Sequence, residues 1–156
     1  SGCEVHSGFY DSFNSLQPQV LNALNNIGAG EVMVTGHSLG AAIAALSAWD
    51  LANRGYTVGP VYTFGQPRVG NDAFSENYDQ TIQEYRVTHW DDIVPHLPPE
   101  LLGFHHVATE VWYNSASTSY QVCDGSGEDS SCSDSRIDLS VDDHLHYLNV
   151  AISESC

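Results

Sequence analysis

The sequence predicts an α/β fold, in which helices cover a mainly parallel β-sheet. Short apolar runs typical of strands alternate along the chain with longer segments of helical periodicity, and turns rich in Gly, Asp or Pro separate them. Because a helix between two strands returns the chain to the same edge of the sheet, such strands pair in parallel. No repeat or linker divides the 156 residues, so we expect residues 1–156 to form a single domain.

The first predicted elements are a helix, a strand and a second helix. Over residues 15–27, apolar residues recur every three or four positions after Ser15, a suitable N-cap, and Gly28 ends the pattern. A short apolar run over residues 31–35 predicts a strand. The Ala-rich segment 39–53 then predicts the second helix, so a strand, a tight turn and a helix follow one another.

The rest of the chain alternates in the same way. Gly70-Asn71-Asp72 is typical of a helix N-cap, which gives Asp72 a structural role. A closing helix is predicted over residues 143–152. Further strands are predicted over residues 61–64, 84–88, 107–113 and 119–122.

Acidic residues outnumber basic ones by 20 to 4, which gives a formal net charge of −16 at pH 7. All four basic residues are arginines, at positions 54, 68, 86 and 136. Such a surface repels phosphate backbones and anionic lipid headgroups, so we expect no nucleic-acid partner and no electrostatic membrane anchor. No run approaches the roughly 20 apolar residues that cross a bilayer. Partners should therefore be neutral or apolar.

Four spread cysteines in an acidic, Lys-free chain indicate a secreted, oxidised protein. None lies in a CxxC pair or beside histidine at the spacing that structural zinc prefers. Cys123 and Cys132 close a short polar loop that needs a covalent link, so we expect these two to pair. The partners of Cys3 and Cys156 stay open on this reasoning.

A Gly-x-Ser-x-Gly motif lies between the strand over 31–35 and the helix over 39–53. Small residues on both sides of Ser38 allow a strained turn that lifts the serine hydroxyl into the open, which predicts a nucleophile. At the start of the helix, the backbone N–H of Leu39 could stabilise a developing oxyanion. The alternative is an ordinary strand-to-helix turn with a capping serine.

A serine nucleophile needs a base and an acid that orients the base. In α/β-hydrolases these follow the serine in the order Asp or Glu, then His. Carboxylates just past the strand over 84–88 lie where ligands bind in such sheets, and we choose Asp92 with Asp91 as the alternate. Asp72 is a weaker candidate because of its N-cap position.

His144 is the predicted base, because it is late in the chain and opens the predicted closing helix. His146, two positions on, would point away from His144 on a helix, so only one of the two faces Ser38. We expect no metal and no cofactor: loop 124–135 resembles an EF-hand only superficially, since Asp129 replaces its glycine and Ser135 its glutamate. The remaining histidines are expected to be hydrogen-bonded loop or core residues: His6, His37, His89, His96, His105 and His106.

Longer blocks of sequence point to a known family. They are CEVHxGFY at 3–10, VTGHSLGA at 34–41, YTFGQPRxGN at 62–71, YRVTHxxD at 85–92, PxLPP at 95–99, HxxxExW at 106–112 and HxxY at 144–147. With these blocks in order along nearly the whole chain, the sequence resembles the filamentous-fungal class 3 lipases and their relatives, the type-A feruloyl esterases.

The resemblance implies an α/β-hydrolase fold and a secreted carboxylic ester hydrolase. By position, Ser38 matches the family nucleophile, Asp92 the acid, His144 the base, and Leu39 the residue whose amide forms half of the oxyanion hole. The implied substrates are glycerides, with contact to a lipid interface but no membrane span. The alternatives are a feruloyl or aryl esterase acting on plant cell-wall esters, and a non-catalytic module with the same fold.

The sequence departs from the family in length, because members have an upstream half that supplies strands, the second oxyanion donor and a lid. Without it, Val32-Met33-Val34 would present an unpaired apolar edge. In the family, cysteines matching Cys3 and Cys156 bond to that half, while those matching Cys123 and Cys132 bond to each other. The resemblance therefore suggests the C-terminal chain of a cleaved hydrolase, linked by disulfides to a separate N-terminal chain.

Overall fold

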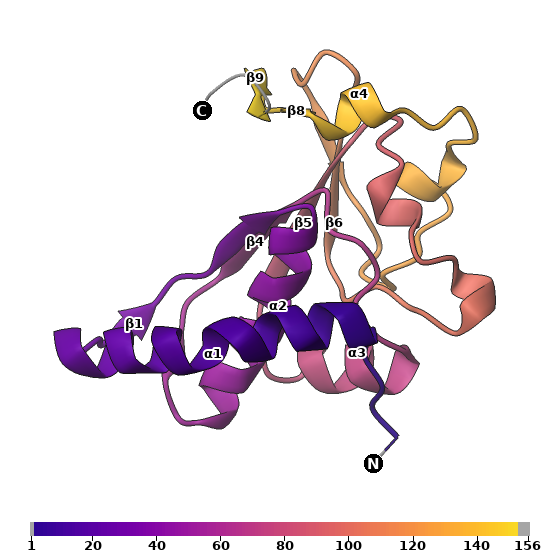
Figure 1. Ribbon diagram of the computed structural model, residues 1–156. Helices are drawn as coiled ribbons and strands as arrows, with labels where there is room; N and C mark the ends of the chain where they lie inside the picture. The colour runs from indigo at the N-terminus through magenta and orange to yellow at the C-terminus, as the bar shows by residue number, and fades with distance from the viewer. Residues whose placement is uncertain (1, 153–156) are drawn as a thin grey trace.

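The computed structural model describes residues 2–152 and contains a five-stranded sheet with helices packed against it (Figure 1). The strand order is β2-β4-β5-β6-β7. The first four strands are parallel, and β7 runs antiparallel to β6. Their bounds are Thr35–His37 (β2), Val61–Phe64 (β4), Glu84–His89 (β5), Glu110–Tyr113 (β6) and Tyr120–Val122 (β7).

The parallel register brings the ends of four strands to one edge. Thr63 of β4 pairs with Gly36 on one side and Arg86 on the other, and Arg86 in turn pairs with Glu110. The carboxyl ends of all four parallel strands therefore lie at the same end of the sheet, where an α/β fold places its functional loops. The predicted parallel α/β sheet is confirmed.

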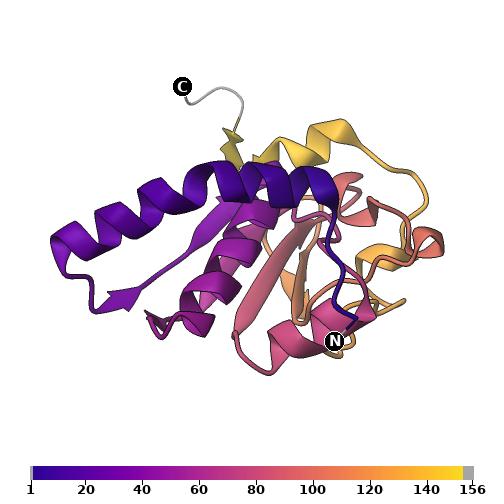
Figure 2. The ribbon, with the colours of Figure 1, turned by 60° about the horizontal axis from the view of Figure 1, so that its bottom comes forward.

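Three helices surround the apolar core: α1 (Ser7–Ile27), α2 (Leu39–Asn53) and α3 (Asp72–Asp79). Figures 1 and 2 show α1 lying across α2. Five of the six alanines of α2 are almost fully buried, because only small side chains allow this helix to lie close to the sheet and to α1. Phe13 of α1 and Phe74 of α3 complete the core.

The start predicted for α1 is wrong by two turns. The helix begins at Ser7 rather than after Ser15, because Phe9 and Phe13 extend its apolar face into the core. The hydroxyl of Ser15 donates to the carbonyl oxygen of Ser12 at 2.7 Å and caps nothing. The C-terminal end is as predicted: Gly28 adopts a left-handed φ of 61°.

The single strand predicted over residues 31–35 is two strands. Glu31–Val32 (β1) pairs in parallel with Thr57–Val58 (β3), which the sequence reasoning missed, while the main sheet receives only β2. Met33 lies between them with 73% of its surface exposed. Among the described residues, β2 has a hydrogen-bonded neighbour on one side only.

The predicted closing helix is also wrong. The helix α4 spans Val141–His144 only, and a small antiparallel hairpin follows, made of His146–Tyr147 (β8) and Val150–Ala151 (β9). Leu148 and Asn149 between them adopt φ of 53° and 63°. Two consecutive left-handed residues form a tight hairpin turn and cannot continue a right-handed helix.

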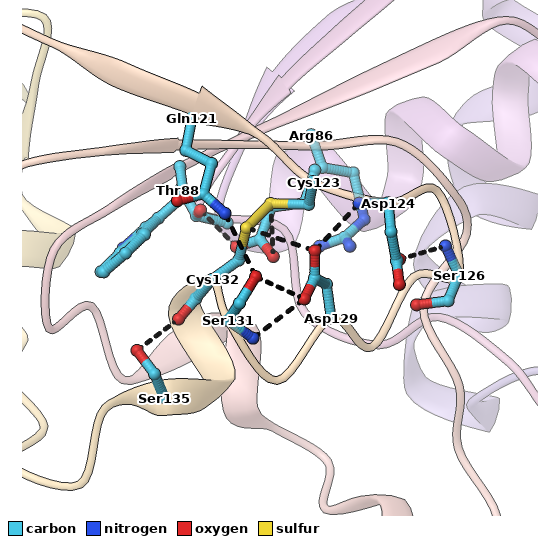
Figure 3. The surroundings of a disulfide bond; sticks show 12 residues. Arg86, Thr88, Gln121, Cys123, Asp124, Ser126, Asp129, Ser131, Cys132 and Ser135 are labelled. Atoms are coloured by element: carbon cyan, nitrogen blue, oxygen red, sulfur yellow. Dashed lines mark hydrogen bonds between the residues drawn. A yellow bond between two sulfur atoms is a disulfide. The ribbon is translucent and has the colours of Figure 1, made fainter.

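Three short 3-10 helices lie beyond β5: Val94–His96 (η1), Glu100–Leu102 (η2) and Ser133–Ser135 (η3). The predicted disulfide joins Cys123 to Cys132 just before η3 (Figure 3). Cys3 is exposed and outside any disulfide among the described residues, and Cys156 lies beyond them. No described helix has both the length and the apolarity to cross a bilayer.

Candidate active site

Ser38 lies on a sharp turn between β2 and α2. Its φ of 58° and ψ of −129° are strained for a residue with a side chain. A Cβ at Gly36 would lie 2.3 Å from the carbonyl oxygen of Gly40, so only glycine fits at position 36. A Cβ at Gly40 would meet nothing within 4 Å, so the tight approach depends on Gly36.

His144 faces this serine from the end of α4. The Ser38 hydroxyl lies 2.8 Å from Nε2 of His144 and donates to it in the tautomer that carries its proton on Nδ1, the ring nitrogen that faces the carboxylate of Asp92. The short helix is held by Ser140, whose hydroxyl accepts a hydrogen bond from the backbone N–H of Asp143 at 3.1 Å. The histidine is 7% exposed, so its ring is largely shielded from water.

Asp92 completes a continuous chain of hydrogen bonds. Nδ1–H of His144 donates to Oδ2 of Asp92 at 2.9 Å, and only 2% of the aspartate is exposed. The backbone N–H of Val94 donates to Oδ1 at 2.8 Å, and the hydroxyl of Tyr147 donates to Oδ2. These donors compensate for the removal of the carboxylate from water.

The other aspartates considered from the sequence lie elsewhere. Asp91, the alternate acid, forms an ion pair with Arg136. Asp72 is in the first turn of α3, where Asn71 caps the helix, as expected from the N-cap pattern. The nearest histidine to its carboxylate is His105, at 3.6 Å.

Gly65, which follows β4, leaves the space in which Asp92 and His144 meet. A Cβ there would lie 2.8 Å from Oδ2 of Asp92 and 2.9 Å from Nδ1 of His144. Its φ of 56° also favours glycine. The sequence reasoning assigned no role to this residue.

His37 is a further site residue that sequence reasoning missed. Its ring stacks on that of His144 with centroids 4.5 Å apart, and Nε2–H donates to the carbonyl oxygen of His144 at 2.8 Å. Burial lowers the pKa of His37, which favours its neutral form. Its place within Gly-x-Ser-x-Gly was the available signal.

His146, as predicted, is turned away and donates to the carbonyl oxygen of Asp142 at 2.8 Å.

The remaining histidines contact backbone carbonyls or lie buried, mostly as expected. His89 and His105 have ring nitrogens within 3.1 and 2.8 Å of carbonyl oxygens. His106 donates to that of Pro95 at 2.7 Å, and burial lowers its pKa well below the usual value. In the described residues, Nδ1 of His6 and Nε2 of His96 are buried without a hydrogen-bond partner.

Leu39 is the first residue of α2, next to Ser38. Because the first amides of a helix have no intrahelical acceptor, its backbone N–H is available to an outside oxygen. Its side chain is 49% exposed, so the surface beside the serine is open. An oxyanion hole requires two or more donors of this kind.

A mainly parallel sheet that brings Ser, Asp and His together at one edge, in this chain order, is the arrangement of an α/β-hydrolase. Residues 1–102 match the family described as Lipase (class 3), and the chain belongs to this family.

Curated relatives include the lipase of Rhizomucor miehei, 43% identical over 162 residues, which cover 96% of this chain and 44% of the relative. The lipase of Rhizopus niveus is 38% identical over 159 residues, covering 96% and 41%. The "Secreted mono- and diacylglycerol lipase 1" of Fusarium solani is 36% identical over 160 residues, covering 95% and 47%. The chain thus spans less than half the length of these relatives.

Solved structures agree with this assignment. Lipase II from Rhizopus niveus superposes with a TM-score of 0.86 at 37% identity, covering 96% of this chain and 60% of that one. A structure described as "A serine protease triad forms the catalytic centre of a triacylglycerol lipase" gives a TM-score of 0.85 at 40% identity, covering 97% and 62%. The resemblance drawn from the sequence to the class 3 lipases is confirmed.

Proposed function

We propose that this chain carries the catalytic residues of a secreted carboxylic ester hydrolase that cleaves glycerides through an acyl-enzyme. The observation that carries the proposal is the unbroken hydrogen-bond chain from Ser38 through His144 to Asp92. A buried, paired carboxylate behind an imidazole that contacts a serine on a strained turn is suited to acyl transfer.

The proposed reaction has two halves. Nε2 of His144 accepts the hydroxyl proton while Oγ of Ser38 attacks the ester carbonyl, and the imidazolium then gives that proton to the leaving alcohol. Water attacks the acyl-enzyme with the same base and releases the fatty acid. Asp92 holds the tautomer that leaves Nε2 free to accept and stabilises the positive charge on the ring.

The backbone N–H of Leu39 is proposed as one oxyanion donor, and the second is proposed to come from outside residues 2–152. Loss of one such donor typically costs about 3 kcal/mol in transition-state stabilisation, or a hundredfold and more in rate. The described chain alone should therefore hydrolyse esters slowly. Addition of the segment that supplies the second donor should restore the rate.

We infer that this segment is an N-terminal chain of the same hydrolase, linked through Cys3 and Cys156. The support is the share of the relatives that the chain spans and the open edge of β2. Met33, two residues before β2, is 73% exposed, and an open strand edge is prone to pair with another chain. Non-reducing electrophoresis tests the inference, and a single 17 kDa species with Cys3 bonded to Cys156 would overturn it.

Glyceride esters are the proposed substrates because the relatives are named lipases, including a mono- and diacylglycerol lipase. The word "secreted" in that name and the disulfide support an extracellular location. Rates on a tributyrin emulsion and on methyl ferulate test the substrate class. Faster turnover of methyl ferulate would favour an aryl esterase.

Substitution Ser38→Ala tests the nucleophile. The variant should lose covalent labelling by a fluorophosphonate probe and nearly all ester turnover. Ser47→Ala is the matched control, since Ser47 lies on α2 and its hydroxyl donates only to the carbonyl oxygen of Ile43. Turnover that survived Ser38→Ala would show that the nucleophile is misassigned. Retained labelling in the Ser47 variant would show that the alanine change in α2 is tolerated.

A further inference from the structure

Two chain segments lie side by side next to the hydrogen-bonded pair of Asp92 and His144. The first, residues 90–93, carries the aspartate, and the second, residues 136–144, carries the histidine. The backbone N–H of Ser140 donates to the carbonyl oxygen of Asp91 at 2.7 Å, and that of Ile93 donates to the carbonyl oxygen of Ser140 at 3.2 Å. The contact of the two site residues thus depends on the register of these segments.

Arg136 joins the same segments through its side chain. Its Nε donates to Oδ1 of Asp91, and the terminal nitrogen Nη2 donates to Oδ2 of the same carboxylate at 3.3 Å. The ion pair is shielded, with the side chains of Arg136 and Asp91 27% and 14% exposed. A planar guanidinium that binds both carboxylate oxygens fixes direction as well as distance.

The guanidinium of Arg136 also lies over the ring of Trp90, with Cζ 4.0 Å from the ring centroid. Trp90 has a φ of 35°, which is rare for a bulky residue and persists only where the surroundings hold it. Its backbone N–H donates to Tyr113, its carbonyl oxygen accepts from the indole of Trp112, and the two indole rings are parallel to within 1°.

The two carboxylates that follow the strained Trp90 have different partners. Asp91 contacts Arg136, whereas Asp92 contacts His144. Each residue of the segment 90–92 therefore contacts either the segment 136–144 or β6. Arg136 is the side chain that contacts both Trp90 and Asp91.

We propose that Arg136 is a positioning residue for the pair Asp92 and His144. Its guanidinium locks segment 90–93 against segment 136–144, so that Nδ1 of His144 meets Oδ2 of Asp92. It also neutralises the carboxylate next to the proposed catalytic acid. The effect on turnover rests on the proposed function, whereas the effect on the hydrogen bond between His144 and Asp92 does not.

The test compares four variants of the isolated enzyme with the wild type. They are Arg136→Ala, Arg136→Lys, Asp91→Asn and a double variant that combines Arg136→Ala and Asp91→Asn. Arg136→Ala should lower kcat about tenfold with KM within about twofold, since a misplaced base slows the chemical step without changing binding. The low-field proton resonance of Nδ1–H of His144 should weaken or shift. Lysine should restore only part of kcat, because an ammonium group cannot form the two-pronged pair.

Asp91→Asn should also lower kcat, and the double variant should be no slower than Arg136→Ala, since the two residues act as a unit. Arg54→Ala is the matched control. Arg54 forms an ion pair with Asp50 on α2, with Nε 2.6 Å from Oδ2. Loss of this ion pair should leave kcat unchanged.

The proposal is overturned if Arg136→Ala keeps kcat within about twofold and keeps the low-field resonance, whatever the change in melting temperature. If that variant does not fold, Arg136→Lys decides in the same way. A wild-type enzyme without turnover would refute the proposed function, and the resonance would still decide whether Arg136 positions His144.

Discussion

The hydroxyl of Tyr147 donates a hydrogen bond to Oδ2 of Asp92, the oxygen that also accepts Nδ1–H of His144. Tyr147 is 4% exposed and belongs to β8, three residues after the histidine. Burial, together with the nearby carboxylate of Asp92, raises its pKa well above the usual value, so the hydroxyl remains a donor. The short hairpin thus places a second donor on Oδ2 of the proposed catalytic acid, beside Nδ1–H of His144.

Substitution Tyr147→Phe should lower both activity and stability. The buried carboxylate of Asp92 loses one donor, so we expect the free energy of unfolding to fall by about 1–3 kcal/mol and kcat to fall severalfold. Urea unfolding and ester turnover measure the two effects. Tyr62→Phe is the control, because Tyr62 is 43% exposed and its ring stacks on Tyr85. Equal losses in the two variants would contradict the role given to Tyr147.

The sequence reasoning named Ser38, Asp92 and His144, which the structure brings into contact. The signals for the serine and the aspartate were local, whereas His144 was chosen from its place late in the chain. A serine between glycines after a strand, and an aspartate just past another strand, are placed by the parallel sheet alone. Asp92, rather than Asp91, contacts His144, and Arg136 forms an ion pair with Asp91 instead.

What the sequence did not predict depends on contacts between distant segments. The stacking of His37 on His144 and the space left by Gly65 exist only once β2, β4 and α4 are assembled. The predicted closing helix was wrong because Leu148 adopts a left-handed φ that its residue type does not favour. Tertiary packing of the hairpin overrides that preference.

Substitution Gly65→Ala should remove activity. The new methyl group would lie within 3 Å of both Asp92 and His144, so one of them must move, and we expect kcat to fall about a hundredfold. Gly28→Ala is a matched control, because Gly28 has a similar φ of 61° and an added Cβ would meet nothing within 4 Å.

Both glycine variants should lose about 1–2 kcal/mol of folding free energy from the left-handed backbone, but only Gly65→Ala should lose turnover. Ester hydrolysis and urea unfolding of the two purified proteins distinguish these effects. If kcat fell equally in both, backbone strain alone would account for the loss.

Glu84 should make stability depend on pH. It is buried at the start of β5, where its carboxyl group accepts hydrogen bonds from the hydroxyls of Tyr78 and Thr63, and burial raises its pKa from 4.5 to about 7. The folded state therefore binds this proton more tightly than the unfolded chain. The resulting stability is fully present below pH 4.5 and is lost as the pH rises through about 7.

Substitution Glu84→Gln should remove this dependence. The free energy of unfolding of the wild type, relative to the variant, should fall by about 3 kcal/mol between pH 4.5 and 7. Urea unfolding at several pH values measures the difference. Glu76→Gln, at an exposed position of α3, is the matched control for the change of side chain. A flat difference for Glu84 would mean that the carboxylate is ionised at low cost in the folded state.

The disulfide between Cys123 and Cys132 holds a polar loop whose contacts reach into the protein (Figure 3). The carbonyl oxygen of Gly127 accepts from the buried Arg86 at 2.9 Å, and the carboxylate of Glu128 accepts from Arg68 at 2.6 and 2.8 Å. Arg68 is 2% exposed, so its charge depends on these partners. The loop therefore supplies acceptors to two arginines of the interior.

Replacing both cysteines with serine should lower the free energy of unfolding by at least about 2–3 kcal/mol. This is the value expected for a loop of this length, because without the disulfide the unfolded chain gains conformational entropy. Loosening of Glu128 would add to the loss, because the buried charge of Arg68 would lose its closest acceptor. Urea unfolding of the wild type and of the double variant measures the loss. Within the described part of the chain, no hydrogen bond of the loop reaches Ser38 or His144, so kcat should change less than about twofold, and a larger drop would mean that the loop also supports the site.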